Sequence, residues 1–375
     1  MDKTKYNRSI VAAGTQVNNG LEESAACGSS VVYDQKYGLV FLVYMTGTRT
    51  SYGESSGRIC LSVFSPTQPT NIRFRRVDDW LGGTRGVLCM CAWLIGDAKI
   101  RMLFTTTKGQ LGAFYRDYDF LTDTLSDRME AFFEHNSQQL TVNNDSYRAI
   151  LADYGFSDVS DAQCIINKSF VYNDEVYTAV TLDAVHYPLI CKIKDNLIIP
   201  FACCPKQGRY EFRCYVNETG IHGVYRHHID DHDTGKTGYA FSPDNGQTWQ
   251  FTDFEDGIQS RPDILPYYGK PLIIYNYADD SSIENFPHMH HNRNAIKILY
   301  DGKILFRCFE KYGIVEHTTI NIYGDLYMAF STCEQALSVA TGNAKWIEHG
   351  FPVEQGKEEI KWVKLGYLLE KDAVS

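Results

Sequence analysis

Histidine, arginine and carboxylate side chains gather in two short stretches of this chain. Residues 226–232 read Arg-His-His-Ile-Asp-Asp-His, and residues 288–293 read His-Met-His-His-Asn-Arg. A guanidinium binds a carboxylate through two parallel hydrogen bonds, while imidazole and carboxylate groups can transfer protons. The two stretches therefore indicate a site for an acidic ligand. His288-x-His290 would also suit zinc, but no His-Glu-x-x-His motif or paired cysteines support it, so we expect no metal.

Strand-like hairpins separate these stretches. An apolar strand, a turn with Gly, Asn or Asp, and a second strand rich in β-branched and aromatic residues recur along the chain. They lie at 30–44, 88–104, 164–182, 211–226, 264–277 and 318–330. Each unit is long enough for one four-stranded blade of a propeller. The sequence predicts an all-β, six-bladed β-propeller, with five or seven blades as alternatives. The predicted blades are 29–80, 86–134, 161–207, 209–256, 258–312 and 314–349.

Three further features complete the predicted organisation. Asn143-Asn144-Asp145 can cap a short helix, so we expect a helical insertion near 143–156. Residues 10–16 and 360–369 look like strands that could close the ring and remove its exposed edge. Nothing resembles a linker or a low-complexity segment, so we expect a single domain over residues 1–375.

Residues 242–249, Ser-Pro-Asp-Asn-Gly-Gln-Thr-Trp, set the register of the strands. Asp244 can accept backbone N–H bonds within a tight turn, Gly246 tolerates a positive φ, and Trp249 can pack beneath the loop. The octet resembles the Asp-box of the sialidase-like β-propellers, and this resemblance implies that the turn joins strand C to strand D of a blade whose strands run A to D outward from the axis. Weaker echoes at 64–67 and 301–303 fit the same position. The B–C loops and the D-to-A crossings then share the opposite face.

This register brings the polar side chains to one mouth, as a binding site requires. Residues at the starts of the A strands, among them Glu211 and His317, share the mouth with the two stretches above. The predicted catalytic residues are Asp231, Asp263, Glu316 and His228. The predicted substrate-binding residues are Arg213, Arg226, Arg261, Arg293, His227, His291 and Tyr275. A structural alternative is that Arg261 and Asp263 form a local ion pair, and that residues 226–232 are only a solvated loop.

Composition excludes several functions. Lys+Arg 36 against Asp+Glu 46 gives a net charge of −10, which suits neither nucleic acid nor an anionic membrane. An anionic ligand would need a local cluster of arginines.

No long apolar run or N-terminal apolar region occurs, so the sequence predicts a cytoplasmic protein without a signal peptide. Phosphate loops and dinucleotide fingerprints are missing, and we expect no cofactor. The eleven cysteines lack a regular framework and are expected to be buried thiols.

The octet at 242–249 fits S-x-D-x-G-x-T-W, and with Ser260-Arg261-Pro262-Asp263 and Asn292-Arg293-Asn294-Ala295 it resembles the sialidase-like (BNR or Asp-box repeat) β-propeller superfamily. The likeness covers roughly residues 209–340 and is firm only at the octet. That superfamily includes sialidases, other exo-glycosidases and polysaccharide lyases. The resemblance implies an exo-acting glycoside hydrolase that cleaves a terminal, acidic sugar from an oligosaccharide or glycoconjugate.

The chain also departs from the sialidase pattern. Sialidases grip a carboxylate with three arginines and use a Tyr–Glu nucleophile and an Asp acid/base. The nearest arginines here are Arg213, Arg261 and Arg293, but the Phe/Tyr-Arg-Ile-Pro motif is absent. One alternative is a uronate lyase, with His227 or His228 and Tyr225 or Tyr275 as the base. Another is a glycan-binding propeller without catalytic activity.

Overall fold

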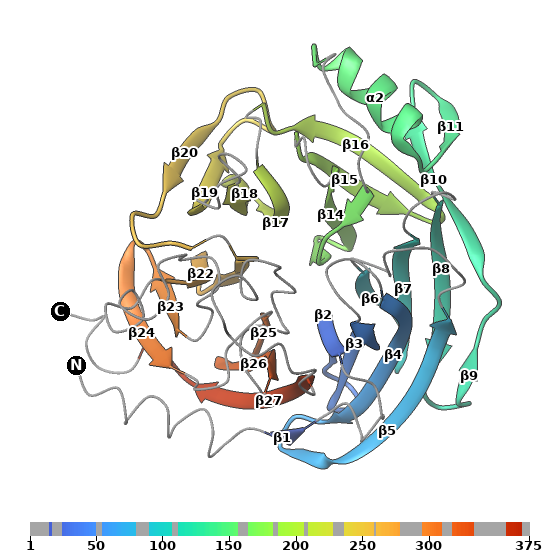
Figure 1. The fold of residues 1–375 in the computed structure, drawn as a ribbon, viewed down its shortest axis with the longest axis vertical. Coiled ribbons are helices and arrows are strands. Elements are labelled where there is room, and N and C mark those ends of the chain that lie inside the picture. The colour runs from blue at the N-terminus through green and yellow to red at the C-terminus, as the bar shows by residue number, and fades with distance from the viewer. Residues whose placement is uncertain are drawn as a thin grey trace, which may run out of the picture.

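The computed structural model describes residues 15–16, 25–49, 55–79, 90–106, 112–156, 164–182, 187–205, 209–227, 236–258, 260–277, 295–309, 317–333 and 358–369. Within these ranges the chain is nearly all β-strand with one helix, and the sheets surround a common axis (Figure 1). This arrangement confirms the predicted all-β propeller.

Four sheets have four antiparallel strands each, ordered from the axis outward. The first contains β2 (Ala25–Asp34), β3 (Leu39–Arg49), β4 (Ser55–Ser65) and β5 (Gln68–Asp79). Another contains β17 (Arg209–Asn217), β18 (Gly220–His227), β19 (Lys236–Ser242) and β20 (Gln250–Asp253). It is followed by β21 (Asp263–Tyr267), β22 (Lys270–Asn276), β23 (Ala295–Tyr300) and β24 (Lys303–Phe309). The last contains β25 (His317–Ile322), β26 (Asp325–Cys333), β27 (Glu358–Gly366) and β1 (Thr15–Gln16).

The remaining strands form one eleven-stranded sheet. Its first part contains β6 (Met90–Gly96), β7 (Lys99–Thr106), β8 (Gly112–Asp119), β9 (Thr124–Leu125), β10 (Met129–His135) and β11 (Gln138–Thr141). Its second part contains β12 (Cys164–Ile166), β13 (Phe170–Tyr172), β14 (Glu175–Leu182), β15 (Leu189–Lys194) and β16 (Leu197–Cys203). A short parallel pairing of β10 with β16 joins the two parts. A count of six blades therefore remains an interpretation, in which this sheet is two blades joined at their outer strands.

The inner strands contact one another around a closed ring. Contacts run from β2 to β6, from β7 to β12, from β13 to β17, from β17 to β21, from β21 to β25 and from β25 back to β2. The ring is closed by the chain ends as predicted, because β1 pairs with β27. The predicted last blade, 314–349, was too short at its C-terminal end, because β27 is its third strand. Ile360, Trp362 and Val363 explain this difference, since all three are buried in the core.

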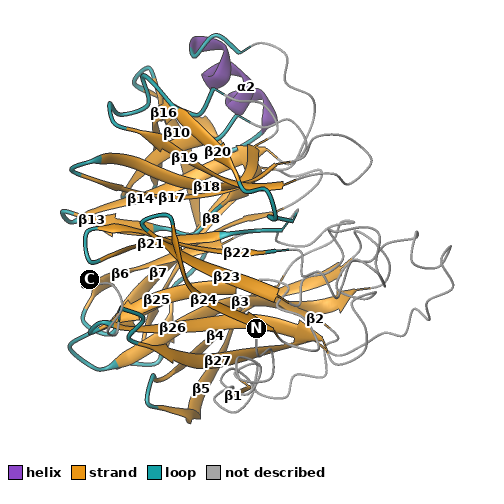
Figure 2. Ribbon diagram, turned by 90° about the vertical axis from the view of Figure 1, so that its left-hand side faces the viewer, coloured by secondary structure: helices purple, strands orange, loops and turns teal. Residues whose placement is uncertain are grey.

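The predicted turns and helix are present. The turns of the six predicted hairpins lie at 35–38, 97–98, 173–174, 218–219, 268–269 and 323–324, each within its predicted hairpin. The insertion contains α2 (Asn144–Asp153), and the Asn143 side chain caps it by accepting a 2.9 Å hydrogen bond from Ser146 N. In Figure 2 the described turns gather on one side of the propeller, in teal. We call this the turn face, and the opposite face, where β17, β21 and β25 begin, the mouth face.

The turn at 242–249 has the predicted hydrogen bonds. Asp244 Oδ1 accepts from Thr248 N at 2.8 Å, and Asp244 Oδ2 accepts from Thr248 Oγ1 at 2.6 Å. Gly246 has φ +91°, a conformation that favours glycine. Trp249 precedes β20 and its Nε1 donates to Gly246 O at 3.1 Å. The octet therefore shapes a tight C–D turn on the turn face.

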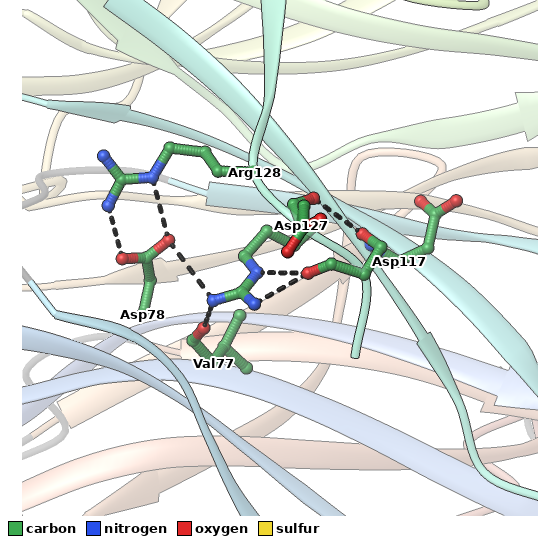
Figure 3. A network of polar contacts seen from close by, with 7 residues as sticks. Val77, Asp78, Asp117, Asp127 and Arg128 are labelled. Atoms are coloured by element: carbon green, nitrogen blue, oxygen red, sulfur yellow. Dashed lines mark hydrogen bonds and ion pairs between the residues drawn. The ribbon is translucent and has the colours of Figure 1, made fainter. Parts of the chain in front are cut away.

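Apolar and polar contacts both join neighbouring sheets. Trp362 of β27 packs edge-on against Phe64 of β4, with ring centroids 5.2 Å apart. On the outer strands, Arg128 donates to both oxygens of Asp78 in β5, at 2.5 and 3.2 Å (Figure 3). Arg116 of β8 donates to Val77 O at 2.5 Å beside this pair. The sheets are thus held together at their edges as well as at the axis.

Two other predictions can be compared with the described residues. Cys60, Cys91, Cys191, Cys203, Cys204 and Cys214 are buried thiols, as expected for these six. No helix in the described part of the chain is both long enough and apolar enough to cross a membrane.

Candidate functional site

A cluster of buried charges lies where β17, β21 and β25 begin, close to the axis. Asp263, the first residue of β21, is completely buried. Its carboxylate accepts from Lys168 Nζ at 3.1 and 3.3 Å and lies 3.2 Å from Arg213 Nη1. Thr319 of β25 donates to it twice, from N at 2.7 Å and from Oγ1 at 2.6 Å. Three inner strands and the β12–β13 connection therefore meet at one carboxylate.

Charge pairing keeps Asp263 ionised. Burial would raise the pKa of Asp263, but Lys168 and Arg213 act in the opposite direction, with help from the Thr319 hydrogen bond. The pKa of Asp263 is lowered to about 2 as a result. Burial lowers the pKa of Lys168, and Asp263 offsets part of this effect. A buried carboxylate with these partners is suited to fixing the geometry of the axis.

His317 completes this group, which we call the axial cluster: Lys168, Arg213, Asp263, His317 and Thr319. Arg213 Nη1 donates to His317 O at 2.7 Å. The imidazole is completely buried, and neither ring nitrogen has a hydrogen-bond partner among the residues that the structure describes. Burial lowers the pKa of His317 to about 3, with Arg213, Lys168 and Arg261 adding to the effect and Asp263 opposing it. The ring is therefore neutral at pH 7.

Glu211, Arg226 and Arg261 form a second group at the mouth-face ends of their strands, which we call the mouth triad. Arg261 Nη2 donates to Glu211 Oε1 at 3.0 Å, and Arg226 Nη1 donates to Glu211 Oε2 at 3.2 Å. The side chains are 7%, 17% and 11% exposed for Arg261, Arg226 and Glu211. One carboxylate thus holds two guanidinium groups side by side.

The backbone at Glu211 is unusual for a strand. Its φ is +49°, and the pairing of β17 with β18 shifts register between Tyr210 and Arg213. A non-glycine residue in the left-handed region is strained, and such strain concentrates at functional sites. The bulge breaks the regular alternation of side chains along β17. This irregularity brings Glu211 between Arg226 and Arg261.

The two groups together carry positive charge. The mouth triad has two arginines and one carboxylate, and the axial cluster has Lys168 and Arg213 against Asp263. Counted over these named residues alone, each group has a formal charge of +1, because His317 is neutral. The whole chain carries −10. The described side chains at this end of the axis are therefore cationic within an acidic protein, a setting that favours an anionic group.

The structure separates two predicted binding residues from this site. His227 Nδ1 lies 3.6 Å from Asp253 Oδ1 on the outermost strand β20, and Tyr225 donates to the same oxygen at 2.8 Å. Tyr275 is buried and donates to Asp256 Oδ1 at 3.0 Å. Burial raises the pKa of Tyr275 to about 12. The structure therefore brings together Arg213, Arg226, Arg261 and Asp263 from the predicted site, and places His227 and Tyr275 with other partners.

The other predicted site residues, Asp231, His228, Glu316, Arg293 and His291, lie outside the described residues. So do His288 and His290 of the alternative zinc site. Within the described ranges, no group of three or more His, Cys, Asp and Glu side chains could hold a metal ion.

Sequence reasoning assigned no role to several residues of the site. Glu211 and His317 were expected at the mouth only as general polar residues. The available signal was their position at the starts of predicted A strands, which does not say which partners they contact. Lys168 and Thr319 were missed, because nothing in their local sequence distinguishes them from surface residues.

Comparisons with known proteins address the fold. No family model matches this chain, and neither does any curated protein. The structure of Trypanosoma rangeli sialidase in complex with sialic acid is similar, with a TM-score of 0.58 and 9% identity over 96% of this chain. The α-L-arabinofuranosidase from Fusarium graminearum, in complex with an iminosugar inhibitor, has a TM-score of 0.50 and 6% identity over 94% of this chain.

These structures differ in how much of their own length is matched. The chain spans 57% of the sialidase and 98% of the arabinofuranosidase. Identities this low show a shared fold and leave the reaction to be argued from the site.

Proposed function

We propose that this chain is a glycoside hydrolase that removes a terminal, acidic sugar at the mouth of the propeller. The observation that carries this proposal is the mouth triad above the axial cluster. Arg226 and Arg261 present guanidinium groups side by side, which is the arrangement that binds a carboxylate. The similar fold of a sialidase in complex with sialic acid supports an acidic sugar as the ligand.

Most glycoside hydrolases use two carboxyl groups, one on each side of the glycosidic bond, whereas sialidases use a tyrosine nucleophile. Glu211 is our candidate for a carboxyl group, because its side chain retains 11% exposure and already lies between the two guanidinium groups. Asp231 and Glu316 are the candidates for the other, and Glu316 directly precedes His317 in the chain. His228, His291 and Arg293 remain candidates for contacts to the sugar.

Asp263 and Arg213 take positioning roles in this proposal. Asp263 is completely buried and bound by four hydrogen bonds from Lys168 and Thr319, so it is poorly suited to acid or base catalysis. Arg213 is buried between Asp263 and His317 O. Together they fix the starts of β21 and β25. Residues that we expect to contact the substrate lie in or just before these strands.

A glycan-binding protein without catalytic activity is the second candidate. Of the two carboxylates that the described residues place at this end of the axis, the Glu211 side chain is 11% exposed and Asp263 is completely buried. The hydrolase proposal therefore takes its second carboxyl group from Asp231 or Glu316. The lyase alternative is weaker, because Tyr225 and Tyr275 both donate hydrogen bonds to carboxylates and the pKa of Tyr275 is raised. A tyrosine that acts as a base would need surroundings that lower the pKa of its hydroxyl group.

Mass spectrometry of a mixed panel of acidic oligosaccharides incubated with the protein tests this proposal. Products heavier by one water would support hydrolysis, and Glu211→Gln should lower their rate of formation about a hundredfold or more. Glu175→Gln is the matched control, because Glu175 also pairs with a cation, Lys192, but lies on the turn face. Unsaturated fragments would establish a lyase, and retention of a glycan without any product would favour the binding protein.

A further inference from the structure

The most exposed aromatic side chains of the described residues lie on the turn face, opposite the mouth. Tyr37, Tyr268 and Tyr323 occupy the A–B turns of three neighbouring sheets, and Tyr367 directly follows β27. They are 40%, 55%, 72% and 42% exposed, respectively. Tyrosine at such positions adds nothing to the core, and exposed aromatic groups of this size commonly mark an interaction site.

Direct contacts bring Tyr268 to the Tyr367 ring and to the turn that carries Tyr323, across two sheets. Tyr268 and Tyr367 pack edge to face, with centroids 5.7 Å apart and planes at 89°. Gly324 has φ +91°, and a Cβ at this position would lie 2.5 Å from the Tyr268 hydroxyl. Tyr268 therefore lies directly against the turn that carries Tyr323. We call Tyr268, Tyr323 and Tyr367 the tyrosine platform.

A fourth tyrosine supports the platform from the first sheet. Tyr33 of β2 packs against Tyr323 at 5.9 Å with planes at 85°. Burial and the neighbouring Tyr323 raise the pKa of Tyr33 to about 12. The pKa of Tyr268 is also raised, by burial and by Tyr367. These phenols therefore stay protonated and uncharged at neutral pH.

Three oppositely charged pairs lie on or beside the turns around the platform. Lys270 pairs with Asp301, and Lys364 pairs with Asp325 at 2.6 Å. Lys36 pairs with Asp97 in the adjoining turns. Neither sign of charge prevails among these pairs, in contrast to the cationic site at the mouth. A polyanion or a charged peptide would find no complementary field here.

We propose that the tyrosine platform is a second, non-catalytic binding surface for uncharged carbohydrate. Each ring offers an apolar face to the C–H groups of a sugar, and each phenol can exchange hydrogen bonds with sugar hydroxyls. Tyr268 and Tyr367 stand at right angles to each other and are both exposed, so a sugar ring could lie against the exposed part of either one. Binding here is independent of the function proposed for the mouth.

Saturation-transfer NMR with cellohexaose and maltohexaose tests the proposal on the full chain. At least one hexaose should receive saturation from the wild-type protein. Tyr268→Ala and Tyr323→Ala should each weaken its binding at least fivefold, and the double variant should abolish it. Leu121→Ala is the matched control, because Leu121 is 56% exposed in a turn of a different sheet, and it should leave binding unchanged.

Three results would overturn the proposal. The first is no saturation transfer from the wild-type protein to either hexaose at millimolar concentration. The second is loss of hexaose binding in Glu211→Gln, which would place the sugar at the mouth. The third is self-association in sedimentation velocity that Tyr268→Ala abolishes, which would make the platform an interface between copies of this chain. Binding retained by Glu211→Gln and lost by the platform variants supports it even if the mouth proves inactive.

Discussion

Arg261 Nη2 donates to Glu211 Oε1 at 3.0 Å, joining residues that are 50 positions apart in the chain. Glu211 belongs to β17 and Arg261 lies two residues before the start of β21, so the bond joins the segments of two neighbouring inner strands. The geometry of the mouth triad therefore depends on how these two sheets pack. A change in that packing would alter the spacing of the guanidinium groups.

Arg261→Lys tests whether the planar guanidinium group of Arg261 binds a carboxylate of the substrate through two parallel hydrogen bonds. Lysine keeps the positive charge but cannot make two parallel hydrogen bonds to a carboxylate. We expect kcat/KM on an acidic oligosaccharide to fall at least tenfold, which corresponds to about 1.4 kcal/mol. Steady-state rates on the substrate found in the oligosaccharide panel measure this.

The control for Arg261→Lys is Arg101→Lys. Arg101 also pairs with a carboxylate, Asp117, at 2.7 Å, but on β7 and β8. Its substitution should leave kcat/KM unchanged. Equal rates for Arg261→Lys and the wild-type enzyme would show that the guanidinium group does not bind the sugar in this way.

Asp263→Asn tests the axial cluster as a structural element. The substitution leaves Lys168 and Arg213 buried without their carboxylate, and breaking a buried ion pair in this way costs about 3–5 kcal/mol of unfolding free energy. Denaturant unfolding followed by circular dichroism measures the change. Asp145→Asn is the control, because Asp145 pairs with Arg148 but is 92% exposed, and it should cost less than about 1 kcal/mol. Equal losses would show that the axial cluster contributes little to stability.

Local patterns in the sequence predicted much of the fold. Gly, Asn and Asp at the turns, with apolar alternation beside them, placed the six predicted hairpins, because these residues adopt the required backbone angles. The Asn143 cap and the Asp244 turn were readable for the same reason, since their hydrogen bonds join residues close in sequence. Arg213, Arg261 and Asp263 were also placed at one mouth, because strand order alone puts the starts of the A strands together.

The partners of these residues were not predictable. Lys168 reaches Asp263 across 95 positions and Thr319 reaches it across 56, and no local pattern encodes either distance. His227 was expected beside Arg226, but consecutive strand residues point to opposite faces, so His227 lies with Asp253 instead. The bulge at Glu211 has no proline or glycine to indicate it, and the positive φ appears only in the structure.

The buried His317 predicts a pH dependence of stability. Its pKa is lowered from 6.5 to about 3 in the folded protein, so the unfolded chain binds the proton more readily between these values. Stability should therefore fall as the pH decreases from about 6.5 towards 3, by up to about 1.4 kcal/mol per pH unit. Asp263 has a folded pKa of about 2, lowered from 3.8, so its protonation reduces the stability only below pH 3.8. It therefore does not contribute to the loss of stability in the upper part of this range.

Unfolding free energies measured between pH 7 and 4.5 check this prediction. His317→Gln removes the titrating ring, and its stability should decline less steeply with falling pH than that of the wild-type protein. His135→Gln is the control, because the His135 ring pairs with Asp153 at the surface helix, and it should retain the steep decline. Parallel curves for His317→Gln and the wild-type protein would contradict the assignment.

A hairpin turn can require glycine for its backbone conformation or for the space that a Cβ would fill. Gly220 and Gly269 allow these two reasons to be compared. Both have positive φ, +131° and +80°, so alanine is strained at either position. A Cβ on Gly220 would also lie 2.1 Å from Ser242 O, whereas a Cβ on Gly269 meets nothing within 4 Å. We expect Gly269→Ala to cost about 1–2 kcal/mol of unfolding free energy from strain alone. Gly220→Ala should cost about 1–3 kcal/mol more, because the clash forces the β17–β18 turn away from the turn that contains Asp244. Equal losses in denaturant unfolding would show that these two turns do not constrain each other.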